Sequence, residues 1–142
     1  MDINTSNEEL VHKIQRIETE NADLRQKISS LEEKAARLDL AMLGAQDGIW
    51  LLDLVENTSW VSARYEKLMG LKPQEIKDYY QDWEIRLHPD DRERVLDALK
   101  AHLEERVPYD VEYRLKHKSG EFLWFRSRGQ AVWNDRGQAT KV

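Results

Sequence analysis

Few side chains in this sequence are spaced for catalysis or metal binding. His88 stands next to Asp90 and Asp91, a combination that could hold a metal ion. Carboxylates at the start of a helix point in different directions, however, and helix capping already explains them. There is no cysteine, which excludes thiolate catalysis, cysteine-ligated zinc, iron–sulfur clusters and a flavin–cysteine adduct. With no nucleophile–base pair, phosphate loop or paired catalytic carboxylates either, we expect no catalytic residues and no metal site.

Two arginines could contact an anionic ligand. Arg126 and Arg128 alternate along a predicted strand, on the face shared with Phe122 and Trp124. The same spacing is typical of a strand face turned to solvent or to another helix, which is the interpretation we prefer. Several tryptophans are better explained by packing than by a cofactor box. The tryptophans expected in the core are Trp50, Trp60, Trp83 and Trp124.

The composition excludes several classes of partner. Charged residues make up 35% of the 142 residues, an excess typical of a long solvated helix. The formal net charge of −5 argues against nucleic-acid binding, because contact with phosphates needs a basic face. No apolar run approaches the roughly 20 residues needed to cross a bilayer. We expect a cytoplasmic protein that binds neither nucleic acid nor membrane.

A heptad repeat extends from Asn7 to Ala45. Ser6, followed by Glu8 and Glu9, predicts the N-cap of the helix. Isoleucine at a positions with leucine at d positions favours a parallel two-stranded coiled coil, and Asn21 at a central a position fixes its register. We therefore expect a parallel homodimer. The side chains expected at its interface are Leu10, Ile14, Ile17, Asn21, Leu24, Ile28, Leu31 and Leu38.

Charged residues flank this apolar seam in complementary pairs. In a parallel dimer each g residue faces the e residue five positions later in the partner helix. Every such pair is opposite in sign, and each exposed pair contributes only about 0.2–1 kcal/mol, so the pairs select the partner more than they hold it. A lone charged helix packed on its own domain is the alternative, but it would not need this pattern. The pairs are Lys13–Glu18, Glu20–Arg25, Lys27–Glu32 and Lys34–Asp39.

After Gly48 the pattern changes to that of a small α+β domain. The expected order is two strands, small helices, a longer helix and three strands, which gives one antiparallel sheet with helices on one side. Asp90 and Glu93 predict a capping box at the start of the longer helix, and Gly70 ends a short one. The expected strands are 49–54, 59–62, 111–116, 122–133 and 139–142; the expected helices are 63–69, 73–76 and one from 90 to before 108, with 79–87 irregular.

Eight short motifs between Ala45 and Val142 follow one another in an order and spacing that resemble a PAS domain with a PAC-type second half. They are Asp47-Gly48-Ile49-Trp50 with Asp53, Trp60-Val61-Ser62, Leu68-Met69-Gly70-Leu71, His88-Pro89-Asp90-Asp91, Val111-Glu112-Tyr113-Arg114, Ser119-Gly120-Glu121, Trp124 and Gly137.

This resemblance implies a five-stranded antiparallel sheet, flanking helices and a pocket between them. It divides the chain into a coiled-coil helix over residues 1–46 and a PAS domain over residues 47–142. Some PAS proteins hold heme through a histidine on the longer helix, which here would be His102, and others bind flavin without a covalent bond; we expect His102 to be partly exposed and predict no cofactor. From strand alternation and the family topology, the candidate pocket residues are Leu52, Met69, Ile76, Leu99, Tyr113 and Leu115.

The resemblance also implies a regulatory role, as in bacterial-type sensor histidine kinases of two-component systems or in diguanylate cyclases. We expect a dimeric sensory module that binds a small molecule or relays a conformational signal to a downstream effector. The alternative is a dimerisation or protein-interaction module without a ligand. The family's last strand is normally longer and closes with an Asp-Ile-Thr type motif, whereas this sequence ends at Val142. We therefore expect a truncated last strand and an effector domain in a longer protein, and no enzyme in this chain itself.

Overall fold

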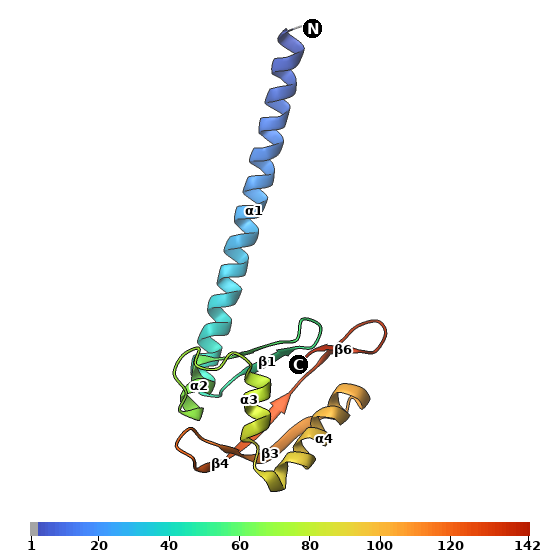
Figure 1. Ribbon diagram of the computed structural model, residues 1–142. Coiled ribbons are helices and arrows are strands. Elements are labelled where there is room, and N and C mark those ends of the chain that lie inside the picture. The colour runs from blue at the N-terminus through green and yellow to red at the C-terminus, as the bar shows by residue number, and fades with distance from the viewer. Residues whose placement is uncertain (1–2) are drawn as a thin grey trace. The chain divides into compact units, whose positions relative to one another are not determined.

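The computed structural model describes residues 3–142, and the chain divides into two units, one ending at Ala45 and one from Gln46 to Val142. The first unit is α1 (Ile3–Ala45), an uninterrupted helix (Figure 1). Ser6 lies inside this helix, so the predicted N-cap at Ser6 is wrong. Residues Ile3 to Thr5 contain neither glycine nor proline, and nothing in them stops the helix from extending toward the N-terminus.

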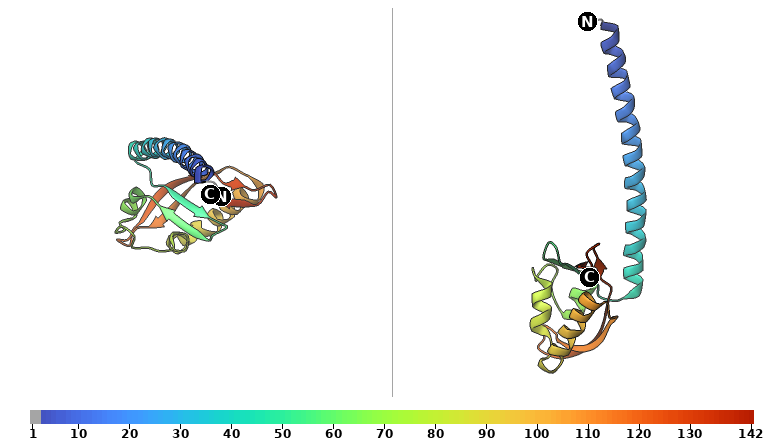
Figure 2. Two further views of the ribbon diagram at one scale, coloured as in Figure 1. Left: turned by 90° about the horizontal axis from the view of Figure 1, so that it is seen from above. Right: turned by 90° about the vertical axis from the view of Figure 1, so that its right-hand side faces the viewer.

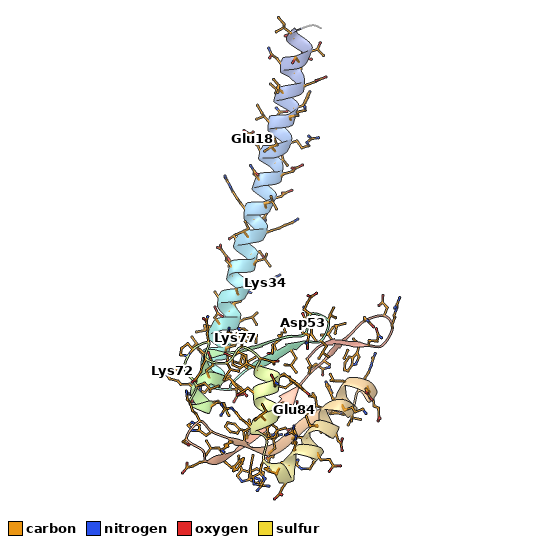
Figure 3. All side chains as sticks on the ribbon, in the orientation of Figure 1. Glu18, Lys34, Asp53, Lys72, Lys77 and Glu84 are labelled. Atoms are coloured by element: carbon orange, nitrogen blue, oxygen red, sulfur yellow. The ribbon has the colours of Figure 1, made fainter. Side chains whose placement is uncertain are left out.

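The apolar seam of α1 is open in the single chain, and none of the described residues of α1 is buried. The leucine and isoleucine side chains at its a and d positions, from Leu10 to Leu38, are between 52% and 65% exposed. Figure 3 shows Glu18 and Lys34, two of the charged residues that flank the seam, extending from this helix. A helix gains most of its stability in a protein by burying an apolar face, and α1 buries none within its own unit.

The second unit begins with the predicted hairpin. Strand β1 (Trp50–Asp53) pairs antiparallel with β2 (Thr58–Val61). The Asp53 carboxylate, labelled in Figure 3, accepts hydrogen bonds from the backbone N–H groups of Val55 and Glu56 at 3.1 and 3.0 Å. The Asp53 side chain thus supplies the acceptor for two backbone N–H groups of the turn, as aspartate commonly does.

Helix α2 (Ala63–Met69) has the bounds that the sequence predicts. The Ser62 hydroxyl accepts a hydrogen bond from the Tyr65 N–H at 3.2 Å and caps its start. Gly70 ends it with a φ of 74°, a left-handed conformation that suits glycine.

The segment after α2 differs from the prediction in two ways. No helix forms over residues 73–76, because Gln74 adopts a positive φ of 59° and its N–H donates to the Glu66 carboxylate at 2.8 Å. The stretch expected to be irregular instead forms α3 (Tyr79–Arg86). Asp78 caps this helix by accepting from the Gln81 N–H at 3.1 Å, and Arg86 pairs with Asp82 one turn earlier at 2.7 Å.

Helix α4 (Pro89–Glu105) starts one residue before the predicted capping box. His88, rather than Asp90, is the N-cap, and its Nδ1 accepts a hydrogen bond from the Asp90 N–H at 3.1 Å. Pro89 sits in the first turn, where its missing N–H costs nothing. The expected capping box is therefore wrong, because the imidazole supplies the acceptor that a carboxylate was expected to supply.

All strand pairs are antiparallel. Strand β3 (Tyr109–Lys116) pairs along its whole length with β4 (Phe122–Gly129). A second ladder has the order β2-β1-β6-β5, with β5 (Val132–Trp133) and β6 (Ala139–Lys141) joined by the predicted turn. The expected continuous strand over 122–133 is wrong, because the Ala131 N–H leaves the ladder and donates to His102 Nε2 at 2.9 Å.

Helices α3 and α4 lie on one side of the strands (Figure 2), which gives the predicted α+β fold with an antiparallel sheet and flanking helices. The main core cluster contains Val95 of α4 together with Met69, Leu71, Leu87, Tyr113 and Leu115. Two of the tryptophans expected in the core are not there, since Trp124 is 65% and Trp60 49% exposed.

An ion pair ties α4 to β3. The buried Asp91 carboxylate accepts hydrogen bonds from the Arg114 backbone N–H at 3.0 Å, from its Nε at 2.9 Å and from its Nη2 at 2.9 Å. Bidentate pairs of this kind hold their partners in a fixed orientation. The pair therefore sets where α4 lies along the strand, and with it the helix's contribution to the interior.

Candidate ligand pocket

A small cavity lies inside the second unit, with a volume of about 40 Å³. Side chains from α2, α3, α4 and from strands β1 to β4 form its wall. Eight of the twelve lining residues are aromatic, and none carries a charged side chain. The lining residues are Trp50, Leu52, Trp60, Val61, Tyr65, Tyr79, Tyr80, Trp83, Leu99, Tyr109, Tyr113 and Ser127.

Three pairs of aromatic rings around the cavity stand at steep angles, whereas Tyr80 and Trp83 are tilted at 45°. Trp83 and Tyr113 have ring centroids 6.1 Å apart and planes at 78°, and Trp50 and Tyr109 are 6.2 Å apart at 87°. Tyr65 lies at 82° to its neighbour Tyr79 on α3. Edge-to-face contacts of this kind are the favoured geometry of aromatic pairs. These pairs of rings in the wall therefore pack edge to face rather than in parallel stacks.

Three hydrogen bonds hold four of these rings. Trp83 Nε1 donates to the Tyr113 hydroxyl at 3.0 Å, and Trp50 Nε1 donates to Ser127 Oγ at 3.2 Å. The Tyr79 hydroxyl donates to Glu66 Oε2 at 3.0 Å. Buried Trp and Tyr side chains need such partners for their polar atoms. The polar edges of these rings are thus already engaged by the protein.

The tyrosines of the wall stay neutral at physiological pH. Burial raises the pKa of the Tyr65, Tyr109 and Tyr113 hydroxyls above the ordinary value. Burial, followed by the hydrogen bond to Glu66 and the negative charge of that residue, raises the pKa of Tyr79 to about 12. The cavity therefore presents uncharged aromatic side chains to whatever occupies it.

The six candidate pocket residues fall into three groups. Leu52, Leu99 and Tyr113 line the cavity. Met69 and Leu115 are buried in the core cluster and line a different hollow, to which Tyr113 also contributes. Ile76 lies against the core cluster, partly buried, and lines neither.

The second hollow is a larger open groove of about 760 Å³. It is bordered by residues 46–51, by β4 from Trp124 onward and by Val142. Strands β1 and β4 belong to different ladders, so no backbone pairing closes the space between them. We place the candidate pocket in the smaller aromatic cavity, because that site is surrounded by rings on several sides.

Of the eight aromatic residues of the wall, only Tyr113 is among the predicted pocket residues. Tyr79, Tyr80 and Trp83 come together because they share one helix, α3, at positions i, i+1 and i+4. That spacing is visible in the sequence, and the Asp78 cap could have pointed to the helix. Tyr109 and Ser127 could be found only once the pairing of β3 with β4 was known.

His102 is buried rather than partly exposed, with 2% of its surface accessible. Its Nε2 accepts a hydrogen bond from the Ala131 N–H at 2.9 Å, and its Nδ1 lies 2.7 Å from the Val107 carbonyl oxygen. Because Nε2 accepts, Nδ1 must carry the hydrogen and donate it. Both ring nitrogens are thus engaged by the backbone, and neither is free to bind a heme iron.

The other candidates for site chemistry have structural roles. Arg126 is exposed and pairs with Asp110 at 2.7 Å, and Arg128 is also exposed, as the solvent-facing interpretation predicts. Within residues 3–142, no three His, Cys, Asp or Glu side chains converge in a way that could hold a metal ion. Over the same range, no helix has both the length and the apolar character needed to cross a membrane.

Residues 58–142 match a family described as the PAS fold. A crystal structure of a sensory box histidine kinase/response regulator from Burkholderia thailandensis E264 is 45% identical, with a TM-score of 0.64 over 74% of this chain and 78% of that one. The N-terminal domain of a diguanylate cyclase with PAS/PAC sensor from Marinobacter aquaeolei is 26% identical, with a TM-score of 0.59 over 67% and 88%.

A curated relative is also similar in sequence. Sensor protein FixL from Bradyrhizobium diazoefficiens is 34% identical over 92 residues, which is 65% of this chain. The chain spans only 18% of that protein's length.

Proposed function

Because this chain belongs to the PAS fold family, we propose that it is a sensory module that binds a small molecule in its aromatic cavity and acts as a parallel homodimer. The observation that carries this proposal is a cavity walled by eight aromatic side chains and placed between the helices and the strands. Apolar cavities with a few fixed polar groups are the usual form of a small-molecule site.

The effector of this module belongs to a longer protein in our proposal. The relatives bear the names of a sensor protein, a histidine kinase/response regulator and a diguanylate cyclase. Residues 3–45 form α1 and the matched family accounts for residues 58–142, so the described part of the chain holds no catalytic domain. A kinase or a cyclase would then be the output that the sensory unit regulates.

The exposed seam of α1 supports the dimer. Its leucine and isoleucine side chains at a and d positions are more than half exposed, and Asn21 interrupts them at the position where a polar residue favours two parallel strands. Parallel pairing in register would attach both sensory units at the same end of the coiled coil. A ligand that binds one packing arrangement better than another could then shift the pair between two states.

The small volume of the cavity favours a second candidate function. Ligand sites commonly enclose about 300–1,000 Å³, whereas this cavity measures about 40 Å³. A unit with so little internal space could serve as a dimerisation or interaction module that binds no ligand at all.

Native mass spectrometry of the gently purified chain separates the two candidates. We expect the mass of a dimer plus a small bound molecule that leaves on mild activation. Leu99→Phe, which adds volume to the cavity wall, should abolish the bound mass and leave the dimer intact. A dimer with no additional mass in either protein, before and after incubation with a metabolite extract, would favour the module without a ligand.

A further inference from the structure

The buried carboxylate of Glu66 lies directly behind the aromatic wall. Glu66 is 8% exposed, and its Oε2 accepts hydrogen bonds from the Tyr79 hydroxyl at 3.0 Å and from the Gln74 N–H at 2.8 Å. None of the ion pairs formed by residues 3–142 includes Glu66. A buried carboxylate without a basic partner is costly, so a positive charge nearby would be favourable.

The cavity wall itself suits a cation. Ring faces carry negative electrostatic potential, and a cation close to several of them is attracted most strongly where water is excluded. Eight aromatic residues surround this cavity, and no lysine, arginine or histidine lines it. The hydrogen bond from Tyr79 to Glu66 polarises that ring further, because a donor to a carboxylate becomes more electron-rich.

We infer that the cavity binds a small organic cation of the methylated ammonium type, held by the ring faces and by the negative charge of Glu66 behind Tyr79. This inference rests on the proposed function, since it names the ligand class of the same cavity. A neutral molecule would gain nothing from Glu66, and an anion would be repelled both by the carboxylate and by the ring faces. The cavity volume of about 40 Å³ restricts the bound group to a few carbon atoms.

NMR titration of the full chain tests the inference with defined probes. The indole N–H signals of Trp50 and Trp83 report on occupancy, because both rings line the cavity and both N–H groups are hydrogen-bonded there. The probes are methylammonium, trimethylammonium and tetramethylammonium chloride, compared with tert-butanol as a neutral molecule of similar shape and with pivalate as an anion. We expect saturable shifts with at least one ammonium ion, at lower concentration than with tert-butanol, and none with pivalate.

Two variants identify the interactions responsible. Glu66→Gln should weaken binding of the cation and leave the response to tert-butanol unchanged, whereas Glu56→Gln, in the exposed turn after β1, should change neither. Trp60→Leu removes one ring from the wall at a half-exposed position. It should weaken cation binding by roughly 2- to 30-fold, the range of one cation–π contact.

The outcomes separate this inference from the proposed function. Saturation by tert-butanol or pivalate at the same or lower concentration than by any ammonium ion would overturn the cation inference and leave a small-molecule site. Cation binding that Glu66→Gln does not weaken, or that weakens equally in Glu56→Gln, would also overturn it. If no probe of any class shifts either indole and native mass spectrometry finds no bound mass, both the inference and the proposed ligand-sensing function fail.

Discussion

Asp91, the last residue of the motif that begins at His88, forms an ion pair with Arg114. The Arg114 guanidinium, through its hydrogen bonds and its charge, holds the pKa of the Asp91 carboxyl well below its usual range. A carboxyl whose pKa is lower in the folded than in the unfolded chain stabilises the fold above the unfolded value of about 3.9. That contribution is lost as the pH falls below this value toward the pKa of the folded state.

We therefore expect Asp91→Asn to lower the urea midpoint at neutral pH and to make stability less sensitive to acid. Asp90→Asn, at the exposed neighbouring carboxylate, is the matched control and should behave like the natural sequence. Urea unfolding followed by tryptophan fluorescence at several pH values between about 7 and 3 measures both effects. An equal loss of stability on acidification in all three proteins would contradict the assigned role of Asp91.

His102 is a second residue whose role depends on the backbone around it. It joins the end of α4 to the break between β4 and β5 through Val107 and Ala131. Replacing it with leucine, which is of similar size, would leave a buried backbone N–H without an acceptor. We expect His102→Leu to reduce the free energy of unfolding by about 1–3 kcal/mol.

Chemical denaturation of His102→Leu alongside His12→Gln gives the comparison, because His12 is exposed on α1. If His102→Leu reduces the free energy of unfolding no more than His12→Gln does, His102 does not stabilise the break between β4 and β5.

The tertiary contacts of Asp91 and His102 could not be predicted from the sequence, whereas several local features could. The short strands, α2 and the alternating face of Tyr113 and Leu115 follow from local pattern, and the structure confirms them. His102 was expected to be partly exposed, and this prediction is wrong. Its hydrogen-bond partners are brought to it by tertiary structure, and one of them, Ala131, is 29 residues away in the sequence. Most of the aromatic wall was missed for the same reason, since its eight aromatic residues come from five elements that only the fold brings together.

At the scale of elements, the heptad helix α1 was the easiest to predict. Its a and d pattern lies wholly within a contiguous segment and needs no knowledge of tertiary contacts. In contrast, α3 was expected to be irregular because Asp78 was not identified as its N-cap, although the helical spacing of its aromatic residues is visible in the sequence. The expected helix at 73–76 does not form, because the tertiary contact between Gln74 and Glu66 overrides a local preference.

Asn21 is the residue of α1 that would favour a dimer over other oligomeric states. We expect Asn21→Leu to raise the thermal midpoint of the coiled coil and to loosen its oligomeric state, because a buried amide at an a position favours two strands at a cost in stability. Sedimentation equilibrium should show higher oligomers or a mixture, while Asn7→Leu, at the first a position, serves as the control. A strictly dimeric Asn21→Leu protein would contradict this prediction.

The whole molecule combines a PAS sensory unit with a helix whose apolar seam is more than half exposed. The two units are distinct, and α1 leads into the first strand through only a few residues, Gln46 to Ile49. A change of packing in one unit can influence a second copy only if the two chains are held in a defined register. Parallel pairing of α1 is thus the claim on which signal transfer depends.

Disulfide trapping tests that claim most directly, because the natural sequence has no cysteine and any disulfide must come from the introduced residue. Leu10→Cys and Leu38→Cys are prepared separately, each at a d position near one end of the seam, and oxidised under mild conditions. In a parallel pair in register, equivalent d positions lie close enough for a disulfide. We predict that each variant cross-links to itself efficiently. If neither does, while a mixture of the two forms a Leu10→Cys to Leu38→Cys disulfide, the helices pair in opposite directions and the account is contradicted.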